Sequence, residues 1–309
     1  MKYSSYTFNS FLANRRQFII SAVKAAGGLA VLGLQPNCAK GSSLSLTKQY
    51  TVQQIIDLIL KEGSLTPLKE TVDTIKAGSA DQMVTGIVTT MFPTITVIEE
   101  AAKLNANFII AHEPSFYNHK DDTKWVANNT VVKQKQELLE KHKIAIWRFH
   151  DYCHSLKPDA VSYGVAKKAN WLSYYKTGQT ALTIPAISLQ DLVQHLKSSM
   201  GIAQVRIIGD PKQICQRIAL LPGAWGGLMQ VTTAETQKPD VLIVGEVSEW
   251  ETAEYIRDAR LMGATTTLVV LGHAVSEEPG MEWVAEWLQP KLEGIKITHI
   301  ASGNPFTWL

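Results

Sequence analysis

Four apolar segments of this chain each end in a residue that can bind a metal ion. They are Asn107-Phe-Ile-Ile-Ala-His112-Glu113, Ile144-Ala-Ile-Trp-Arg-Phe-His150, Val241-Leu-Ile-Val-Gly-Glu246 and Leu268-Val-Val-Leu-Gly-His273. Such short runs of Val, Ile and Leu are typical of strands that are buried on both faces. In open α/β sheets, ligands bind just beyond the carboxyl ends of the strands. The sequence therefore predicts that histidines and carboxylates converge at one such edge.

The composition is that of an ordinary globular protein. Of the 309 residues, 45% are hydrophobic and 19% are charged, which suffices for one large or two modest domains. The 30 basic and 28 acidic residues leave a formal net charge of only +2, so we expect no nucleic-acid partner. Outside the N-terminal segment the cysteines are Cys153 and Cys215, which allow one disulfide but no thiolate zinc site.

Residues 1–40 resemble a twin-arginine export signal. The pair Arg15-Arg16 is followed by Phe18 and by a weakly apolar stretch that is too short for a permanent transmembrane span. We therefore expect an exported, periplasmic protein with a linker at residues 41–49. An uncleaved N-terminal helix or anchor is the alternative. Lipid attachment at Cys38 is disfavoured, because Gln35-Pro36-Asn37 is a poor approach to a lipidation site.

Strand and helix patterns alternate from residue 50 onward, which is typical of a layered α/β fold. Besides the four segments above, we expect strands at 83–90, 205–208, 218–221 and 295–300. Expected helices cover 50–61, 93–104, 133–142, 188–200, 248–262 and 281–288, the first with Thr51 as its N-cap. We predict a first core part at 50–165, an inserted middle domain at 166–237 and a second core part at 238–309.

The pair His112-Glu113 is the first candidate cluster. Pro114 follows it and forces an extended or turning backbone, so both side chains can lean into one crevice. Together they offer an imidazole and a carboxylate to one or two metal ions. The alternative is a hydrogen-bonded histidine at the sheet edge beside a solvated glutamate.

Two further clusters have side chains four residues apart, which places them on one side of a helical turn. His150 and His154 directly follow an apolar run, although a histidine at a strand end is often a structural residue. His273 and Glu277 offer one nitrogen and one oxygen to metal. Alternatively, Ser276 and the acids after it only complement a helix dipole, which leaves His273 unexplained.

Together these clusters resemble the motifs of the Nif-three-like dinuclear-metal family, often labelled GTP cyclohydrolase 1 type 2. The segment Ala111-His112-Glu113-Pro114-Ser115-Phe116 resembles its His-His-Pro element. Phe149-His150 through His154 is similar to its His-Thr-x-x-Asp element, and Gly272-His273 through Glu277 to its Gly-His-x-x-x-Glu element. Two further segments occur in the same order along the chain as in the family. They are the glycine-rich Gly223-Ala-Trp-Gly-Gly227 and the pair Gly245-Glu246. The resemblance runs from about residue 50 to the C-terminus.

The resemblance implies an α/β (α+β) fold with mixed sheets, an inserted second domain and ring-shaped homohexamers. It implies two divalent metal ions per chain, Zn, Fe, Mn, Ni or Co, with Glu277 as the bridging residue. The implied ligands are His112, Glu113, His154, His273 and Glu277. His150 is a candidate proton carrier, and Asp151 is an alternative ligand to His154.

Two of the implied ligands depart from the family pattern. Glu113 stands where the family has a second histidine, and His154 stands where it has an aspartate. The full set still contains three imidazoles and two carboxylates, so the ligand count and formal charge survive the exchange. This favours a working site over a decayed one.

A metal pair predicts hydrolysis, because two divalent ions lower the pKa of bound water and polarise a carbonyl, imine or phosphoryl oxygen. We expect an unknown small-molecule substrate with an amide, cyclic amidine or phosphoester, since an exported chain has little access to GTP. The alternative is a non-catalytic metal-binding or assembly protein, whose metal site would be closed. Trp147, Tyr152 and Trp225 are candidate pocket walls. The chain has no Gly-x-Ser-x-Gly, Walker A or Gly-x-Gly-x-x-Gly element in the required context.

Overall fold

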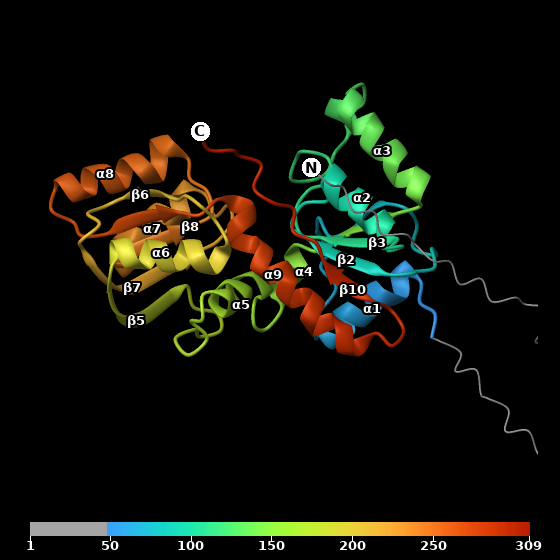
Figure 1. Cartoon of the computed structure of the whole chain (residues 1–309), viewed down its shortest axis with the longest axis horizontal. Coiled ribbons are helices and arrows are strands. Elements are labelled where there is room, and N and C mark those ends of the chain that lie inside the picture. The colour runs from blue at the N-terminus through green and yellow to red at the C-terminus, as the bar shows by residue number, and fades with distance from the viewer. Residues whose placement is uncertain (1–47) are drawn as a thin grey trace, which may run out of the picture. The chain divides into compact units, whose positions relative to one another are not determined.

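The computed structural model describes residues 48–309, which form two five-stranded sheets (Figure 1). The expected export signal at residues 1–40, including Cys38, and most of the expected linker lie outside the described residues. Within residues 48–309, no helix is long and apolar enough to cross a membrane.

The first sheet has the strand order β1-β4-β3-β2-β10, with every neighbouring pair parallel except β1 and β4. Its three central strands are buried along their whole length, as expected for apolar runs covered on both faces. The strands are β1 (Ile75–Ala77), β2 (Ile87–Thr90), β3 (Phe108–Ala111), β4 (Ala145–Arg148) and β10 (Ile297–His299).

Helices cover both faces of the first sheet, and each face has its own apolar core. They include α1 (Val52–Glu62), α2 (Ile95–Lys103) and α3 (Thr130–His142), with a short 3-10 helix at Lys124–Val126. The predicted N-cap of α1 is confirmed: the Thr51 hydroxyl accepts from the Gln54 backbone, and the Gln54 side chain accepts from the Thr51 backbone. This reciprocal cap satisfies two free donors of the first helical turn.

The second sheet has the order β5-β7-β8-β9-β6, with three parallel strands between two antiparallel edges. Both sheets are therefore mixed, and the expected α/β class is confirmed. The strands are β5 (Ala181–Ser188), β6 (Arg206–Ile208), β7 (Ile214–Leu221), β8 (Val241–Val244) and β9 (Thr267–Val270). The helices are α6 (Leu189–Met200), α7 (Gly227–Gln237) and α8 (Glu254–Leu261), with a π-helical turn at Glu249–Ala253.

The change of sheet does not coincide with the boundary expected at residue 238. Strands β8 and β9 belong to the second sheet, although both fall in the expected second core part. The reason is the repeated β-α-β connection from β7 through α7 and α8, which keeps successive parallel strands in one sheet. Only the segment after β9 returns to the first sheet.

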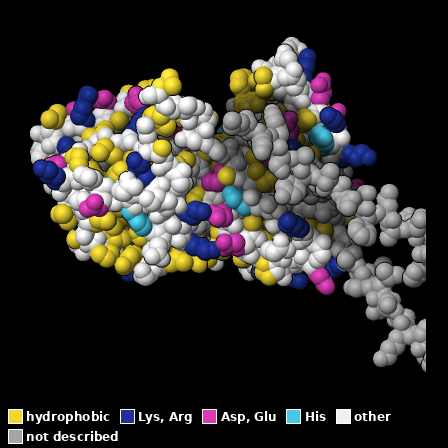
Figure 2. Space-filling view, in the orientation of Figure 1, with side chains coloured by type: hydrophobic (Ala, Val, Ile, Leu, Met, Phe, Trp, Pro, Cys, Tyr) yellow, Lys and Arg dark blue, Asp and Glu magenta, His cyan; other side chains and the backbone are white. Residues whose placement is uncertain are grey.

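Two helices join the sheets, namely α5 (Ala160–Lys168) and α9 (His273–Leu288) (Figure 1). Their backbones approach so closely that a Cβ on Gly164 would lie 2.4 Å from the carbonyl oxygen of Pro279. Ion pairs join the exposed sides of the two helices: Lys168 to Glu282 at 2.7 Å, and Lys167 to Glu286. Acidic and basic side chains gather over this contact in Figure 2.

One expectation needs correction, and one possibility that the sequence left open is decided. The last long helix was predicted at 281–288, but α9 begins at His273 and contains Pro279. Pro279 is the seventh residue of α9 and costs it one backbone hydrogen bond, but buried side chains on both sides of the proline, among them Glu277 and Met281, hold the helix in place. The disulfide between Cys153 and Cys215 is not formed: both thiols are free, and they lie in different apolar cores.

Candidate metal centre

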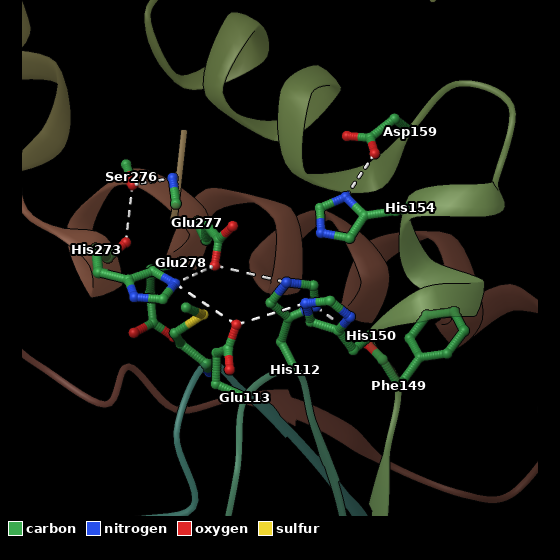
Figure 3. A network of polar contacts seen from close by, with 12 residues as sticks. His112, Glu113, Phe149, His150, His154, Asp159, His273, Ser276, Glu277 and Glu278 are labelled. Atoms are coloured by element: carbon green, nitrogen blue, oxygen red, sulfur yellow. Dashed lines mark hydrogen bonds and ion pairs between the residues drawn. The ribbon is translucent and has the colours of Figure 1, made fainter. Parts of the chain in front are cut away.

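The side chains of the predicted clusters converge where strands of the first sheet end and helix α9 begins (Figure 3). His112 and Glu113 directly follow β3, and the short helix α4 (Asp151–Ser155) follows β4 after His150. From the second sheet, β9 leads into α9, whose first residue is His273 and whose second turn carries Glu277. The apolar runs thus place their terminal side chains as the sequence pattern predicted.

His112 is fully buried and has one uncommitted ring nitrogen. Its Nδ1 lies 3.1 Å from the carbonyl oxygen of Phe149. Its Nε2 has no hydrogen-bond partner and lies 3.5 Å from a carboxylate oxygen of Glu277. Burial lowers the pKa of His112 well below its usual range, and nearby His154 and His150 lower it further. The ring is therefore neutral, with an Nε2 lone pair directed into the site.

Glu113 is buried and lies between a guanidinium and two imidazoles. Its Oε2 is 3.2 Å from Arg148, while its Oε1 lies 3.5 Å from Nε2 of His273 and 3.6 Å from Nε2 of His150. Burial acts to raise the pKa of Glu113, but the hydrogen bond and charge of His273, with those of His150 and Arg148, lower it overall. Glu113 is therefore ionised and presents one oxygen to the site.

Arg148 is a buried charge that sequence reasoning missed. It has no exposed surface, and it donates to the carbonyl oxygens of His112 and His119 as well as to Glu113. Asp121 lies 3.8 Å away on its other side. A charged residue inside the apolar run of β4 was the available signal, because charged residues are almost never fully buried unless paired.

Asp73 holds α4 in place. Its carboxylate accepts hydrogen bonds from three successive backbone N–H groups, those of His150, Asp151 and Tyr152. Such bonds satisfy the free donors at a helix N-terminus. This cap orients the turn that carries both histidines of the second cluster.

The two histidines of the second cluster each have a carboxylate partner. Nδ1 of His150 is 2.9 Å from Asp151, and Nδ1 of His154 is 2.7 Å from Asp159. Burial acts to lower the pKa of His154, but the hydrogen bond to Asp159 and its charge raise it overall. Asp159 also caps α5, which was the signal by which it could have been found.

His273 lies among three carboxylates. Its Nε2 is 3.1 Å from Glu277, and its Nδ1 is 3.2 Å from Glu246, the residue that ends the β8 segment. Burial acts to lower the pKa of His273, yet the hydrogen bonds to Glu113, Glu246 and Glu277 raise it to about 12. The expected side-by-side placement of His273 and Glu277 on one helix face is present.

A glycine turn presses against Glu277. A Cβ on Gly223 would lie 1.9 Å from Oε1 of Glu277, and Gly223 has φ +78°, which favours glycine. The backbone N–H of Gly223 donates to the Ser276 hydroxyl at 2.9 Å, and that hydroxyl donates to the carbonyl oxygen of His273 at 2.8 Å. The predicted glycine-rich segment thus fixes the start of α9.

A pocket of about 1170 Å³ opens onto these residues. The surface is hollowed between the parts that carry the two sheets (Figure 2). Trp225 lines the pocket, as expected of a wall residue. Trp147 and Tyr152 do not: both are buried in the core of the first sheet. Lys135, His119 and Tyr117 line the pocket and were not predicted.

The donor set fits divalent transition-metal ions. In all four site histidines, Nδ1 lies next to a carbonyl or carboxylate oxygen, the arrangement that orients metal-binding imidazoles. Two groups have donor atoms within 4.8 Å of one another and share His112: one adds His150 and His154, the other Glu113 and Glu277. Neither group contains Asp151, whose carboxylate binds Thr71, Val72 and His150 instead.

The similarity to known proteins covers most of the chain. A GTP cyclohydrolase 1 type 2 homolog of Clostridium perfringens is 23% identical over 247 residues, which cover 76% of this chain and 90% of that protein. The crystal structure of Staphylococcus aureus protein SA1388 has a TM-score of 0.65 at 20% identity and matches 84% of this chain and 99% of that one.

A Bacillus cereus protein related to NIF3 has a TM-score of 0.63 at 16% identity and matches 85% of this chain and all of that one, 100%. These structures share the fold with this chain. The model of the family Duf34/NIF3 (NGG1p interacting factor 3) matches residues 51–305. The chain therefore belongs to the Duf34/NIF3 family, as the order and spacing of its motifs predicted.

Proposed function

We propose that this chain binds two divalent metal ions between its sheets and acts as a metal-dependent hydrolase. The observation that carries the proposal is Nε2 of His112, which is buried, neutral and without a hydrogen-bond partner, and which faces the Glu277 carboxylate. A buried polar atom without a partner is costly, so it indicates a ligand.

The proposed metal ligands are His112, Glu113, His154, His273 and Glu277. Carboxylate and imidazole donors in this mixture suit zinc, iron, manganese, nickel or cobalt. A bound metal pair lowers the pKa of water and polarises the oxygen of a substrate carbonyl or phosphoryl group. An amide, a cyclic amidine and a phosphoester are the substrate classes that this chemistry serves.

His150 is the proposed proton carrier. Asp151 accepts from Nδ1 of His150, and Asp151 is itself held by Thr71 and by the backbone of Val72. Nε2 of His150 is thereby left to accept or donate a proton, and His150 lines the pocket. His150 also falls in one of the two donor groups, so its ring lies within reach of the same reacting centre.

The open pocket favours an enzyme over a purely structural metal protein, because a structural metal site is closed. The name GTP cyclohydrolase 1 type 2 belongs to the relatives. We propose a different substrate for this chain, since the signal-like residues 1–40 favour export to the periplasm, where GTP is scarce. Assembly into a homohexamer is a further part of the proposal.

The first test is elemental analysis of the natively exported protein, prepared without chelators. We expect about two transition-metal ions per chain. His112→Ala and His273→Ala should each lose most of the metal, whereas His142→Ala, on α3 outside the site, should keep it. Near-zero metal in a folded wild-type protein would overturn the proposal.

The second test separates catalysis from metal storage. Metal-loaded protein is assayed with amide, cyclic amidine and phosphoester substrates. His150→Gln should lower turnover about 10²- to 10⁴-fold, as expected when a general acid or base is removed, with the metal content unchanged. Full turnover in this variant would exclude His150 as the proton carrier, and full metal loading without any turnover would favour the non-catalytic alternative.

A further inference from the structure

The two ligands that depart from the family pattern each have an oppositely charged partner. Glu113, in place of a histidine, contacts Arg148, and His154, in place of an aspartate, contacts Asp159. The partners come from different elements: Arg148 ends β4, and Asp159 is the N-cap of α5.

The first pair is buried. Arg148 has no exposed side-chain surface, Glu113 has 10%, and the guanidinium lies 3.2 Å from Oε2 of Glu113. Two backbone carbonyls also accept from Arg148, so the guanidinium cannot turn away without losing several hydrogen bonds. Because Oε2 is occupied, Glu113 offers Oε1 to the metal site (Figure 3). The guanidinium cancels most of the carboxylate charge that the metal ions would experience.

The second pair makes its metal ligand more negative, whereas the first pair makes its ligand less negative. Asp159 lies 2.7 Å from Nδ1 of His154, and the side chains are 24% and 34% exposed. A hydrogen bond from Nδ1 to the carboxylate leaves Nε2 of His154 as the donor atom and makes the ring a stronger base. The carboxylate adds one negative charge behind a neutral imidazole.

We propose that each pair acts as one unit toward the metal ions. Glu113 with Arg148 supplies an oxygen donor of nearly zero net charge, as a histidine would. His154 with Asp159 supplies a nitrogen donor with one negative charge, as an aspartate would. The exchange of ligands therefore conserves charge at each position as well as over the whole set. Arg148 and Asp159 are positioning residues in this scheme, and the inference rests on the proposed metal site.

The first experiment tests Glu113 with Arg148 by chelator competition for Zn²⁺. Glu113→His leaves the cluster of Arg148, Asp121 and Lys76 with one excess positive charge beside the metal ions, so we expect zinc affinity to fall at least tenfold. Adding Arg148→Met removes that charge and should return the affinity to within about threefold of the wild type. Circular dichroism and thermal unfolding establish that each variant is folded.

The second experiment tests His154 with Asp159 and does not depend on a buried arginine. Asp159→Asn keeps an acceptor for Nδ1 and a helix cap but removes the charge, and we expect zinc affinity to fall about tenfold. Adding His154→Asp restores one negative charge and should recover the affinity. This pair keeps the inference testable if Arg148→Met fails to fold.

The crossed double variant, Glu113→His with Asp159→Asn, is the matched control. It combines one change from each pair, so the two losses should add without any recovery. Recovery in both matched pairs and none in the crossed variant would support the inference. If zinc binds to the wild type but neither matched pair recovers, the inference is overturned while the metal site stands. A wild type that binds none of Zn²⁺, Fe²⁺, Mn²⁺, Ni²⁺ and Co²⁺ overturns both.

Discussion

The two sheet edges that form the site hold their residues in different ways. The edge of the first sheet carries His112, Glu113 and His150, which are held by a buried ion pair and by hydrogen bonds to carbonyl and carboxylate oxygens. The edge of the second sheet acts through α9, whose His273 and Glu277 are held by close contact with a glycine turn.

This difference separates two ways of fixing a ligand. On the first edge, charge and hydrogen bonds set the orientation of side chains that project from strand ends. On the second edge, backbone packing sets the position of a whole helix start, which then carries both ligands. Electrostatic substitutions should therefore act mainly on the first edge, and changes of volume at the backbone mainly on the second.

The largest effect is expected from Arg148→Met. The change leaves the buried Glu113 carboxylate without its guanidinium and leaves Asp121 with Lys76 alone, and breaking such a buried pair costs about 3–5 kcal/mol of unfolding free energy. This loss of unfolding free energy is measured by denaturant unfolding of the metal-free protein. Arg206→Met, which breaks the exposed ion pair with Glu249 beside the second sheet, should change stability by less than about 1 kcal/mol. Equal losses in the two variants would contradict the proposed role of buried charge.

A pH-dependent effect of similar origin is expected at Lys135. This side chain is buried, donates to the carbonyl oxygen of Ser115 at 2.6 Å and lies over the rings of Phe116 and Tyr117. Burial lowers the pKa of Lys135 from 10.5 to about 8, and Asp121 offsets this only in part. The folded chain therefore loses this proton at a lower pH than the unfolded chain.

The sign of the pH dependence follows from the bound proton. Between about pH 8 and 10.5 the unfolded chain binds more protons at this residue, so its contribution to stability rises with pH, by about 3 kcal/mol in total. Lys135→Met should remove this rise in urea unfolding measured across that range. The exposed Lys133→Met on the same helix should keep it. If the unfolding free energy of Lys135→Met rises with pH as much as that of the wild type, the buried Lys135 charge is excluded as the cause of the rise.

A smaller loss of stability is expected from Gly223→Ala on the second edge. A side chain at φ +78° costs about 1–3 kcal/mol, and its Cβ would displace the Glu277 carboxylate. Gly226→Ala is the matched control, because it has the same φ and nothing within 4 Å of the added Cβ. Both variants should lose stability in denaturant unfolding, but only Gly223→Ala should also lose zinc affinity. Loss of zinc affinity in both variants would show that backbone strain, and not the contact with Glu277, weakens zinc binding.

Local patterns in the sequence predicted eight of the ten strands within residues 48–309 and indicated the candidate ligands, but they missed the edge strands β1 and β5, which are only partly buried. The apolar runs of β3, β4, β8 and β9 are buried along their whole length, and each is followed by a site residue. The spacing of His273 and Glu277 placed them side by side, because residues four apart share one face of a helix. These features depend only on the period of a strand or a helix.

The tertiary structure decided which distant groups complete the site. Arg148 and Asp159 contact their ligands across separate elements, and Gly223 meets Glu277 across a gap of more than fifty residues in sequence. The membership of β8 and β9 in the second sheet likewise followed from their pairing, since a buried apolar strand fits either sheet equally well. Periodicity sets what a segment forms, whereas the packing of whole elements sets which side chains meet.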